Sequence, residues 1–241
     1  MVDAHCHIGL YARPAEIATR CEDHAVTTVA VTNLPSEYRK LLPHTRHWSS
    51  IELALGLHPL ARATNREREA FTSLVDDAPF VGEVGLDFSQ SDEHLRVPQV
   101  ETFEIVLASI KGRRHFVSVH SRRADAFVLD MLERYAIRPV VLHWFSGSQR
   151  SIRRALDSGH LFSINPAMAG SQSGQRIIEA LPRDRVLTET DGPFVKVSNR
   201  PAEPSDVRGV LLCLSGLWGL APEDVEAVTH ENFQRAFTAS A

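Results

Sequence analysis

The chain has 241 residues, 43% of them hydrophobic and 23% charged, with a formal net charge of −4 at pH 7. This composition suits a globular protein with a sizeable core, and the acidic balance argues against a protein coated with nucleic acid through a basic surface. Three scattered cysteines exclude a disulfide framework, and without a secretory signal or an apolar stretch long enough to span a bilayer we expect a cytoplasmic protein with no membrane partner.

Short runs rich in β-branched residues alternate with amphipathic stretches along the whole chain. The expected strands are Val2–His7, Thr27–Thr32, Glu52–Leu57, Phe80–Val84, Phe116–His120, Pro139–His143, Leu161–Ile164 and Arg185–Glu189. The expected helices are Pro14–His24, Ser36–Arg46, Thr64–Val75, Val97–Lys111, Ala124–Tyr135, Gln149–Ser158, Ser173–Leu181 and a final region over Ser205–Phe237 that breaks near Gly219–Pro222.

Strands that alternate with helices indicate a parallel sheet covered by helices, and so an α/β protein. Eight strands in a chain of this length favour a closed (β/α)8 TIM barrel, although periodicity alone leaves an open doubly wound sheet as an alternative. No Gly-x-Gly-x-x-Gly follows the first strand, which removes the commonest dinucleotide-binding version of the open sheet. Because no repeat or Pro/Ser-rich linker divides the chain, we expect one domain over residues 1–241.

Ionisable side chains recur where the expected strands end. They are His5 and His7 on the first strand, Glu83 on the fourth, His120 on the fifth, His143 on the sixth and Asp191 after the eighth. Each histidine taken alone could simply bond a backbone carbonyl. In a barrel, however, all these ends meet at one face, where four imidazoles and two carboxylates would suit divalent metals such as zinc, manganese or nickel.

Six motifs carry these residues in a characteristic order. They are Val2-Asp-Ala-His-Cys-His7, Gly56-Leu-His-Pro59, Gly82-Glu-Val-Gly-Leu-Asp-Phe88, Val119-His-Ser-Arg122, His143-Trp-Phe-Ser-Gly147 and Thr188-Glu-Thr-Asp-Gly-Pro-Phe194. Together they resemble the TatD family of metal-dependent deoxyribonucleases over essentially the whole chain. Within it, the segments His120–Ala124, His143–Ser148 and Phe162–Met168 are similar to the TatD-like nuclease component of bacterial Qat anti-phage systems.

The resemblance implies a metal-binding role for each of the six ionisable residues at the strand ends. In the family, the residues matching His5, His7 and Asp191 bind one metal, the glutamate matching Glu83 bridges two, and those matching His120 and His143 complete the second site. Two divalent ions (Zn, Mn, Mg or Ni) can share a hydroxide and neutralise a phosphodiester oxygen. Glu83 and Asp191 are the expected catalytic residues, with Asp191 placed to orient or deprotonate the attacking water.

Substrate contacts are expected around this centre. Arg122 could clamp a phosphate, while His58 and Arg200 match family positions near the substrate. The neighbouring Arg123 could reach the next phosphate, although we favour the interpretation that it is solvated at the start of a helix. Trp144 and Phe194 could either stack on a base or pack as wall residues. One departure from the family is the acidic pair Asp92–Glu93, which would repel a DNA backbone in the groove.

The leading functional hypothesis is a deoxyribonuclease, exonucleolytic on single-stranded DNA ends, that serves an anti-phage module and meets other proteins of that system. A second hypothesis keeps the metals but assigns a small amide, lactone or modified nucleotide as the substrate. The third is a metal-stabilised scaffold subunit of a defence complex, against which the presence of Asp191 argues.

Overall fold

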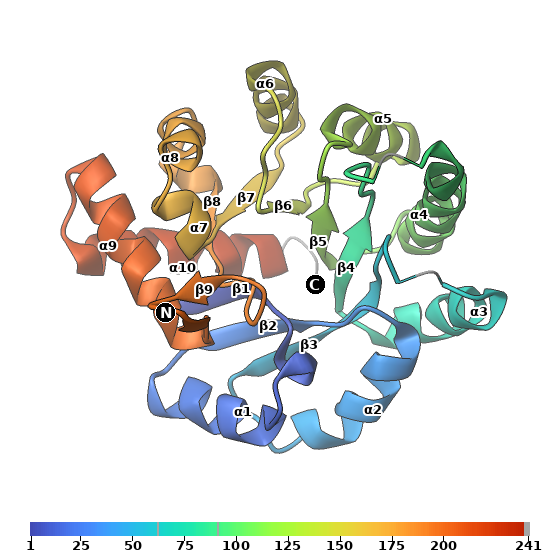
Figure 1. Cartoon of the computed structure of the whole chain (residues 1–241), viewed down its shortest axis with the longest axis horizontal. Helices are drawn as coiled ribbons and strands as arrows, with labels where there is room; N and C mark the ends of the chain where they lie inside the picture. The colour runs from blue at the N-terminus through green and yellow to red at the C-terminus, as the bar shows by residue number, and fades with distance from the viewer. Residues whose placement is uncertain (62, 91, 239–241) are drawn as a thin grey trace.

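The computed structural model describes residues 1–61, 63–90 and 92–238, and eight parallel strands curl into a nearly closed barrel surrounded by helices (Figure 1). In sheet order the strands are β1 (Val2–Cys6), β2 (Thr27–Val31), β3 (Ile51–Leu57), β4 (Phe80–Gly85), β5 (Phe116–His120), β6 (Val141–His143), β7 (Leu161–Ile164) and β8 (Val186–Thr188). Just beyond β1 and β8, the His7 and Asp191 amides donate to the Gly192 and His5 carbonyls at 2.8 and 2.9 Å. The (β/α)8 barrel is therefore confirmed, and the open sheet was the wrong alternative.

Helices follow the strands much as the sequence predicts. They are α1 (Pro14–Asp23), α2 (Pro35–Thr45), α3 (Asn65–Leu74), α4 (Arg96–Ile110), α5 (Asp125–Tyr135), α6 (Gln149–Asp157), α8 (Gln172–Glu179), α9 (Val207–Trp218) and α10 (Pro222–Thr238). The short helix α7 (Pro166–Ala169) and the hairpin of β9 (Lys196–Val197) and β10 (Arg200–Pro201) were not predicted. Within the described residues, no helix is both long and apolar enough to cross a membrane.

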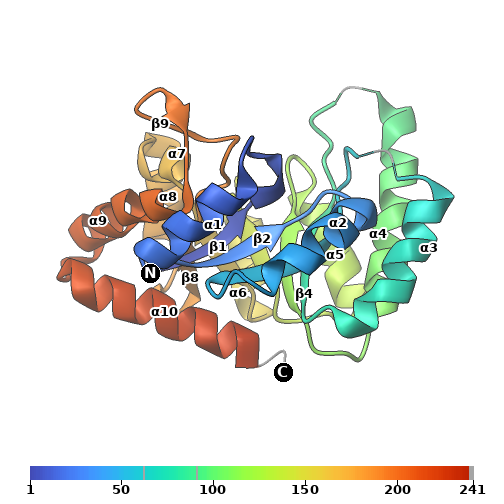
Figure 2. The same ribbon diagram turned by 90° about the horizontal axis from the view of Figure 1, so that it is seen from below.

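The barrel is filled at the end where its strands begin. Phe80 and Phe116 start β4 and β5 and pack in one buried cluster with Phe233 of α10. Figure 2 shows α10 along one side of the molecule, with the β9–β10 hairpin at the opposite side. The end of the barrel where the strands begin, which we call the lower end, is filled with hydrophobic side chains. The polar candidate ligands lie at the other end, where the strands finish.

Two strands that carry candidate ligands have irregular registers at the positions of His5 and Glu83. The pairing of β1 with β2 shifts between Asp3 and Cys6, and the pairing of β4 with β5 shifts between Val81 and Val84. A bulge changes which side chains of a strand face inward. Phe80 can therefore fill the barrel while Glu83, three residues later, also reaches its interior.

A buried histidine in the shell gives the fold a predictable response to acid. The Nδ1 atom of His160 accepts a hydrogen bond from the Val140 amide at 3.2 Å, and burial lowers the pKa of His160 to about 4. In the unfolded chain a histidine binds its proton near pH 6.5, so the free energy of unfolding falls as the pH drops from about 6.5 toward 4. The contribution of His160 to this fall should be about 2 kcal/mol between pH 7 and pH 5.

The variant His160→Asn should lose this contribution, because its side-chain oxygen can accept the same amide without titrating. Denaturant unfolding of the parent and the variant at pH 7 and pH 5 measures the difference. The matched control is His24→Asn, at an exposed position, which should keep the pH dependence of the parent. A variant as sensitive to acid as the parent would contradict the prediction.

Candidate metal centre

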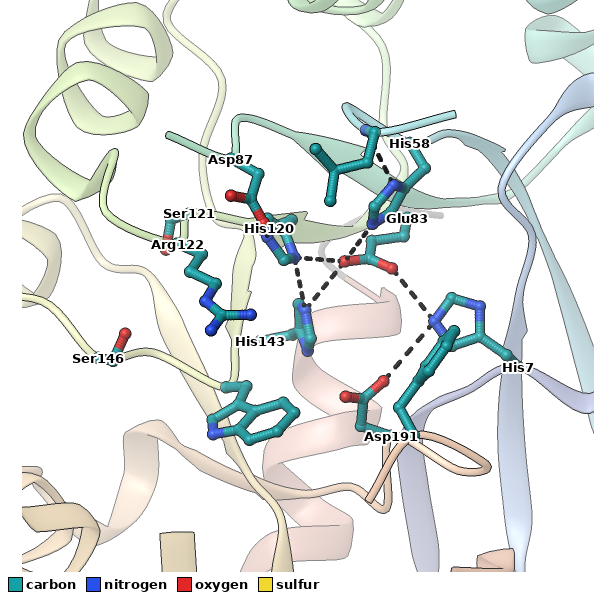
Figure 3. A pocket seen from close by; sticks show the side chains of 13 residues that line it. His7, His58, Glu83, Asp87, His120, Ser121, Arg122, His143, Ser146 and Asp191 are labelled. Atoms are coloured by element: carbon teal, nitrogen blue, oxygen red, sulfur yellow. Dashed lines mark hydrogen bonds and ion pairs between the residues drawn. The ribbon is translucent and has the colours of Figure 1, made fainter. Parts of the chain in front are cut away.

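The candidate ligands predicted from the strand ends converge on one carboxylate. Glu83 stands at the mouth of the barrel, beside a cavity of about 580 Å³ whose lining includes His7, His120, His143 and Asp191. Figure 3 shows the Glu83 carboxylate between His7 on one side and His120 and His143 on the other. We call this space the metal cavity.

One oxygen of Glu83 faces the first group of ligands. Its Oε2 atom lies 3.6 Å from His5 Nε2 and 3.2 Å from His7 Nε2. Asp191 Oδ1 lies 3.7 Å and 3.6 Å from the same two nitrogens. Three candidate ligands thus surround the Oε2 side, and all of them are buried.

The other oxygen of Glu83 faces a second group of imidazoles. Its Oε1 atom lies 2.6 Å from His120 Nδ1, 3.0 Å from His143 Nε2 and 3.4 Å from His58 Nε2. The sequence predicted His58 as a substrate contact, yet its ring nitrogen is close enough to this group to share a cation with Glu83 and His120.

The ring of His5 provides a direct test of whether a cation fits. Its Nδ1 lies 2.7 Å from the Ser118 hydroxyl, while its Nε2 is buried without a hydrogen-bond partner. A neutral imidazole that donates from Nδ1 presents a lone pair at Nε2, which is the form that binds a metal. The donor set of imidazoles and carboxylates therefore fits a divalent ion, with Ser118 fixing the ring.

Burial and neighbouring imidazoles shift the pKa values of the two carboxylates of the centre in opposite directions. Burial raises the pKa of Asp191 to about 8, and His143 only partly opposes this. Burial also raises the pKa of Glu83, but the imidazoles of His58, His143 and His120 outweigh it and leave that pKa well below its usual range. A cation near Asp191 would stabilise its ionised form in the same way.

Three carboxylates that were not among the predicted site residues contact the ligand residues. Asp87 Oδ2 lies 2.9 Å from His120 Nε2, and Glu189 Oε1 lies 3.5 Å from His143 Nδ1. Asp3 accepts hydrogen bonds from the amides of His5 and Thr190 at 3.2 and 2.9 Å. Such contacts orient ligand rings. The only signal in the sequence was that these acids belong to the same motifs as the ligands.

The predicted substrate residues divide into those at the cavity and one elsewhere. His58, Arg122, Trp144 and Phe194 all line the metal cavity. Arg200 does not line it, because it sits on the β9–β10 hairpin and its guanidinium pairs with both oxygens of Asp206 at 2.7 Å.

The acidic pair is exposed in the turn just before α4 and does not line the metal cavity either. Asp92 accepts a hydrogen bond from the His94 amide at 3.0 Å, and Glu93 pairs with Arg96 at 3.4 Å. Both carboxylates therefore interact with residues two or three positions further along the chain.

Comparison with known proteins identifies the family. The family model described as TatD related DNase matches residues 2–238. The human deoxyribonuclease TATDN3 is 25% identical, with 98% of this chain and 94% of the human protein aligned, and the metal-dependent hydrolase YcfH of Escherichia coli K12 is 28% identical, with 98% and 95% aligned. The crystal structure of the E. coli TatD homologue YJJV has the same fold, with a TM-score of 0.88 at 21% identity over 98% of this chain and 97% of that one. The chain therefore belongs to the TatD family of deoxyribonucleases and is a metal-dependent hydrolase of that type.

Proposed function

We propose that this protein is a two-metal exonuclease that removes nucleotides from single-stranded DNA ends in bacterial anti-phage defence, and that residues 1–241 act as one domain. The observation that carries the two-metal assignment is the position of Glu83. One of its oxygens faces His5, His7 and Asp191, and the other faces His120 and His143. A carboxylate placed in this way can bridge two ions.

Each side chain has a distinct task in this proposal. Bound divalent ions would supply a hydroxide near neutral pH and neutralise the phosphodiester. Glu83 holds the two ligand groups together, and Asp191 accepts the proton of the attacking water at a carboxylate oxygen. Asp87 keeps the ring of His120 in place, and Glu189 supplies a negative charge 3.5 Å from the ring of His143.

The rim of the metal cavity supplies groups that suit a nucleotide. Arg122 lines the cavity, and no carboxylate among the described residues pairs with its guanidinium, so it is available to a phosphate. Trp144 and Phe194 are partly exposed at the same rim and can stack on a base. His58 would contact the phosphate or the ion beside it, and Arg200, being paired with Asp206, has no part in this proposal.

The defence role is supported by the motifs similar to Qat nucleases. The second arginine of His120-Ser-Arg-Arg-Ala124 is Arg123, which is exposed and adjoins the cavity residue Arg122. Partner proteins of a defence system would be expected to meet an exposed part of the chain such as this.

The proposed activity is tested with purified protein on DNA labelled at the 3′ or the 5′ end. Magnesium, manganese, zinc and nickel are each added after chelation, and the metal content of the untreated protein is measured alongside. Release of labelled mononucleotides from one end of single-stranded DNA is the expected result. Hydrolysis of small amides or lactones without any release of nucleotides from DNA would refute it.

The variant Asp191→Asn should lower the turnover number on single-stranded DNA by about 10²- to 10³-fold, because the amide cannot accept the proton of water. Asp157→Asn, at an exposed position at the end of α6, is the matched control and should retain full activity. Plaque assays with both variants test the scaffold hypothesis as well. Defence that persists without turnover would favour a scaffold over an enzyme.

A further inference from the structure

A second cavity adjoins the metal cavity on the side of helices α3 and α4. It has a volume of about 320 Å³ and shares two wall residues, His58 and Leu60, with the metal cavity. We call it the side cavity. Because His58 also lies 3.4 Å from Glu83, only the width of this side chain separates the side cavity from the metal centre.

An arginine without a counter-charge lines the side cavity. Arg68 lies on α3, and its Nε atom is buried with no hydrogen-bond partner. Over residues 1–61, 63–90 and 92–238, no carboxylate forms an ion pair with its guanidinium. By contrast, Arg20 and Arg154 pair with acids at 2.8 and 2.6 Å. A partly buried cation without a partner is costly, and its planar donors match a phosphate.

The other walls suit the remainder of a nucleotide. Leu60, Leu95 and Pro98 provide apolar surface, and Gln99 provides an amide. The Gln99 Oε1 atom accepts a hydrogen bond from the Asp87 amide at 2.8 Å, which fixes the side chain so that its amide nitrogen remains as a donor. Apolar walls with a few fixed polar groups are typical of sites for small organic groups.

The charge near the entrance is compatible with a nucleic acid. Asp92 and Glu93 precede the wall residue Leu95, but neither lines the side cavity. Both are exposed, and Glu93 is paired with Arg96. Among the described residues that line the side cavity, Arg68 is therefore the only Arg, Lys, Asp or Glu, and its guanidinium is the charge that a bound phosphate would meet.

We propose that the side cavity binds the nucleotide next to the scissile phosphodiester, with Arg68 contacting its phosphate. This inference rests on the proposed function, because it requires a substrate of at least two linked nucleotides. It makes Arg68 a specificity-determining residue that separates polynucleotides from small phosphodiesters.

The test compares Arg68→Ala with the parent on two substrates, a single-stranded oligonucleotide and bis-p-nitrophenyl phosphate, which is small enough to occupy the metal cavity alone. The KM for the oligonucleotide should rise about 10- to 100-fold, the loss expected for a charge-assisted hydrogen bond. The kcat should stay within about threefold, and hydrolysis of the small diester should not change. Arg66→Ala, an exposed position on the same helix, is the matched control, and Arg68→Lys should fall between the two.

Each other outcome has a distinct meaning. Equal losses on both substrates would assign Arg68 a structural role, and an unchanged KM for the oligonucleotide would remove the side cavity as a subsite. If the parent cleaves no DNA, the proposed function fails separately. Fluorescence anisotropy with a labelled trinucleotide then tests the subsite without turnover, and equal affinities of the parent and Arg68→Ala would overturn it.

Discussion

Replacing Glu83 by glutamine should lower hydrolysis by about 10⁴-fold, a loss of roughly 5.5 kcal/mol in transition-state stabilisation. The carboxylate offers one oxygen to His5 and His7 and the other to His120 and His143. An amide keeps the shape but loses the charge, and its nitrogen cannot act as a ligand. The variant should therefore bind less divalent metal as well as lose activity, and the metal content of the dialysed protein measures this directly.

The control for this change is Glu101→Gln, which removes the same charge from an exposed position on α4. It should retain the metal content and the activity of the parent. Thermal unfolding distinguishes a lost site from a lost fold, since the polar groups around Glu83 lie above an intact hydrophobic cluster. A Glu83→Gln protein with full metal content and activity within tenfold of the parent would show that Glu83 is not the bridge.

Replacing Gly56 by alanine should destabilise the protein by more than about 4 kcal/mol. A Cβ atom at this position would lie 1.5 Å from the Thr32 carbonyl oxygen and 2.9 Å from that of Gly82. Neither carbonyl is free to move, because Thr32 O accepts the Glu83 amide and Gly82 O accepts the Thr32 amide, both at 3.1 Å. The added methyl group would force β2 and β4 apart directly beneath Glu83.

The melting temperature of Gly56→Ala should fall by 10 °C or more for a chain of this size, and little folded protein should be recovered. Gly209→Ala is the matched control, because a Cβ atom on this exposed helical glycine of α9 meets nothing within 4 Å. It should stabilise the protein by about 0.5–1 kcal/mol. A Gly56→Ala protein that melts within 2 °C of the parent would contradict the steric argument.

Most of the barrel could be predicted because each strand is a short apolar run bounded by an amphipathic helix. All eight strands and the longer helices occur within two residues of their expected ends. The hairpin of β9 and β10 could not be predicted, since its segments, such as Lys196–Val197, are only two residues long and show no periodicity. The same holds for α7, a single turn capped by Asn165.

The convergence of the candidate ligands was predictable because barrel topology brings strand ends together. Their supporting contacts were not. Nothing in the sequence indicates that Gln99 meets the Asp87 amide, because this contact depends on how α4 packs beside the end of β4. The position of Asp87 in the Glu83 motif did not show that it contacts His120, because that contact depends on how the ends of β4 and β5 lie side by side. The pairing of Arg200 with Asp206 could not be foreseen either, and a contact of Arg200 with substrate stays a prediction.

The packed lower end of the barrel limits how substrate can enter the metal cavity and how product can leave it. Phe80, Phe116 and Phe233 close that end, so the metal cavity opens at the other end of the barrel, where the strands finish. A DNA strand cannot thread through the barrel, and the released product must leave by the mouth through which the substrate entered. In the exonuclease proposed above, each round of cleavage would therefore be followed by retreat of the product before the shortened strand could advance.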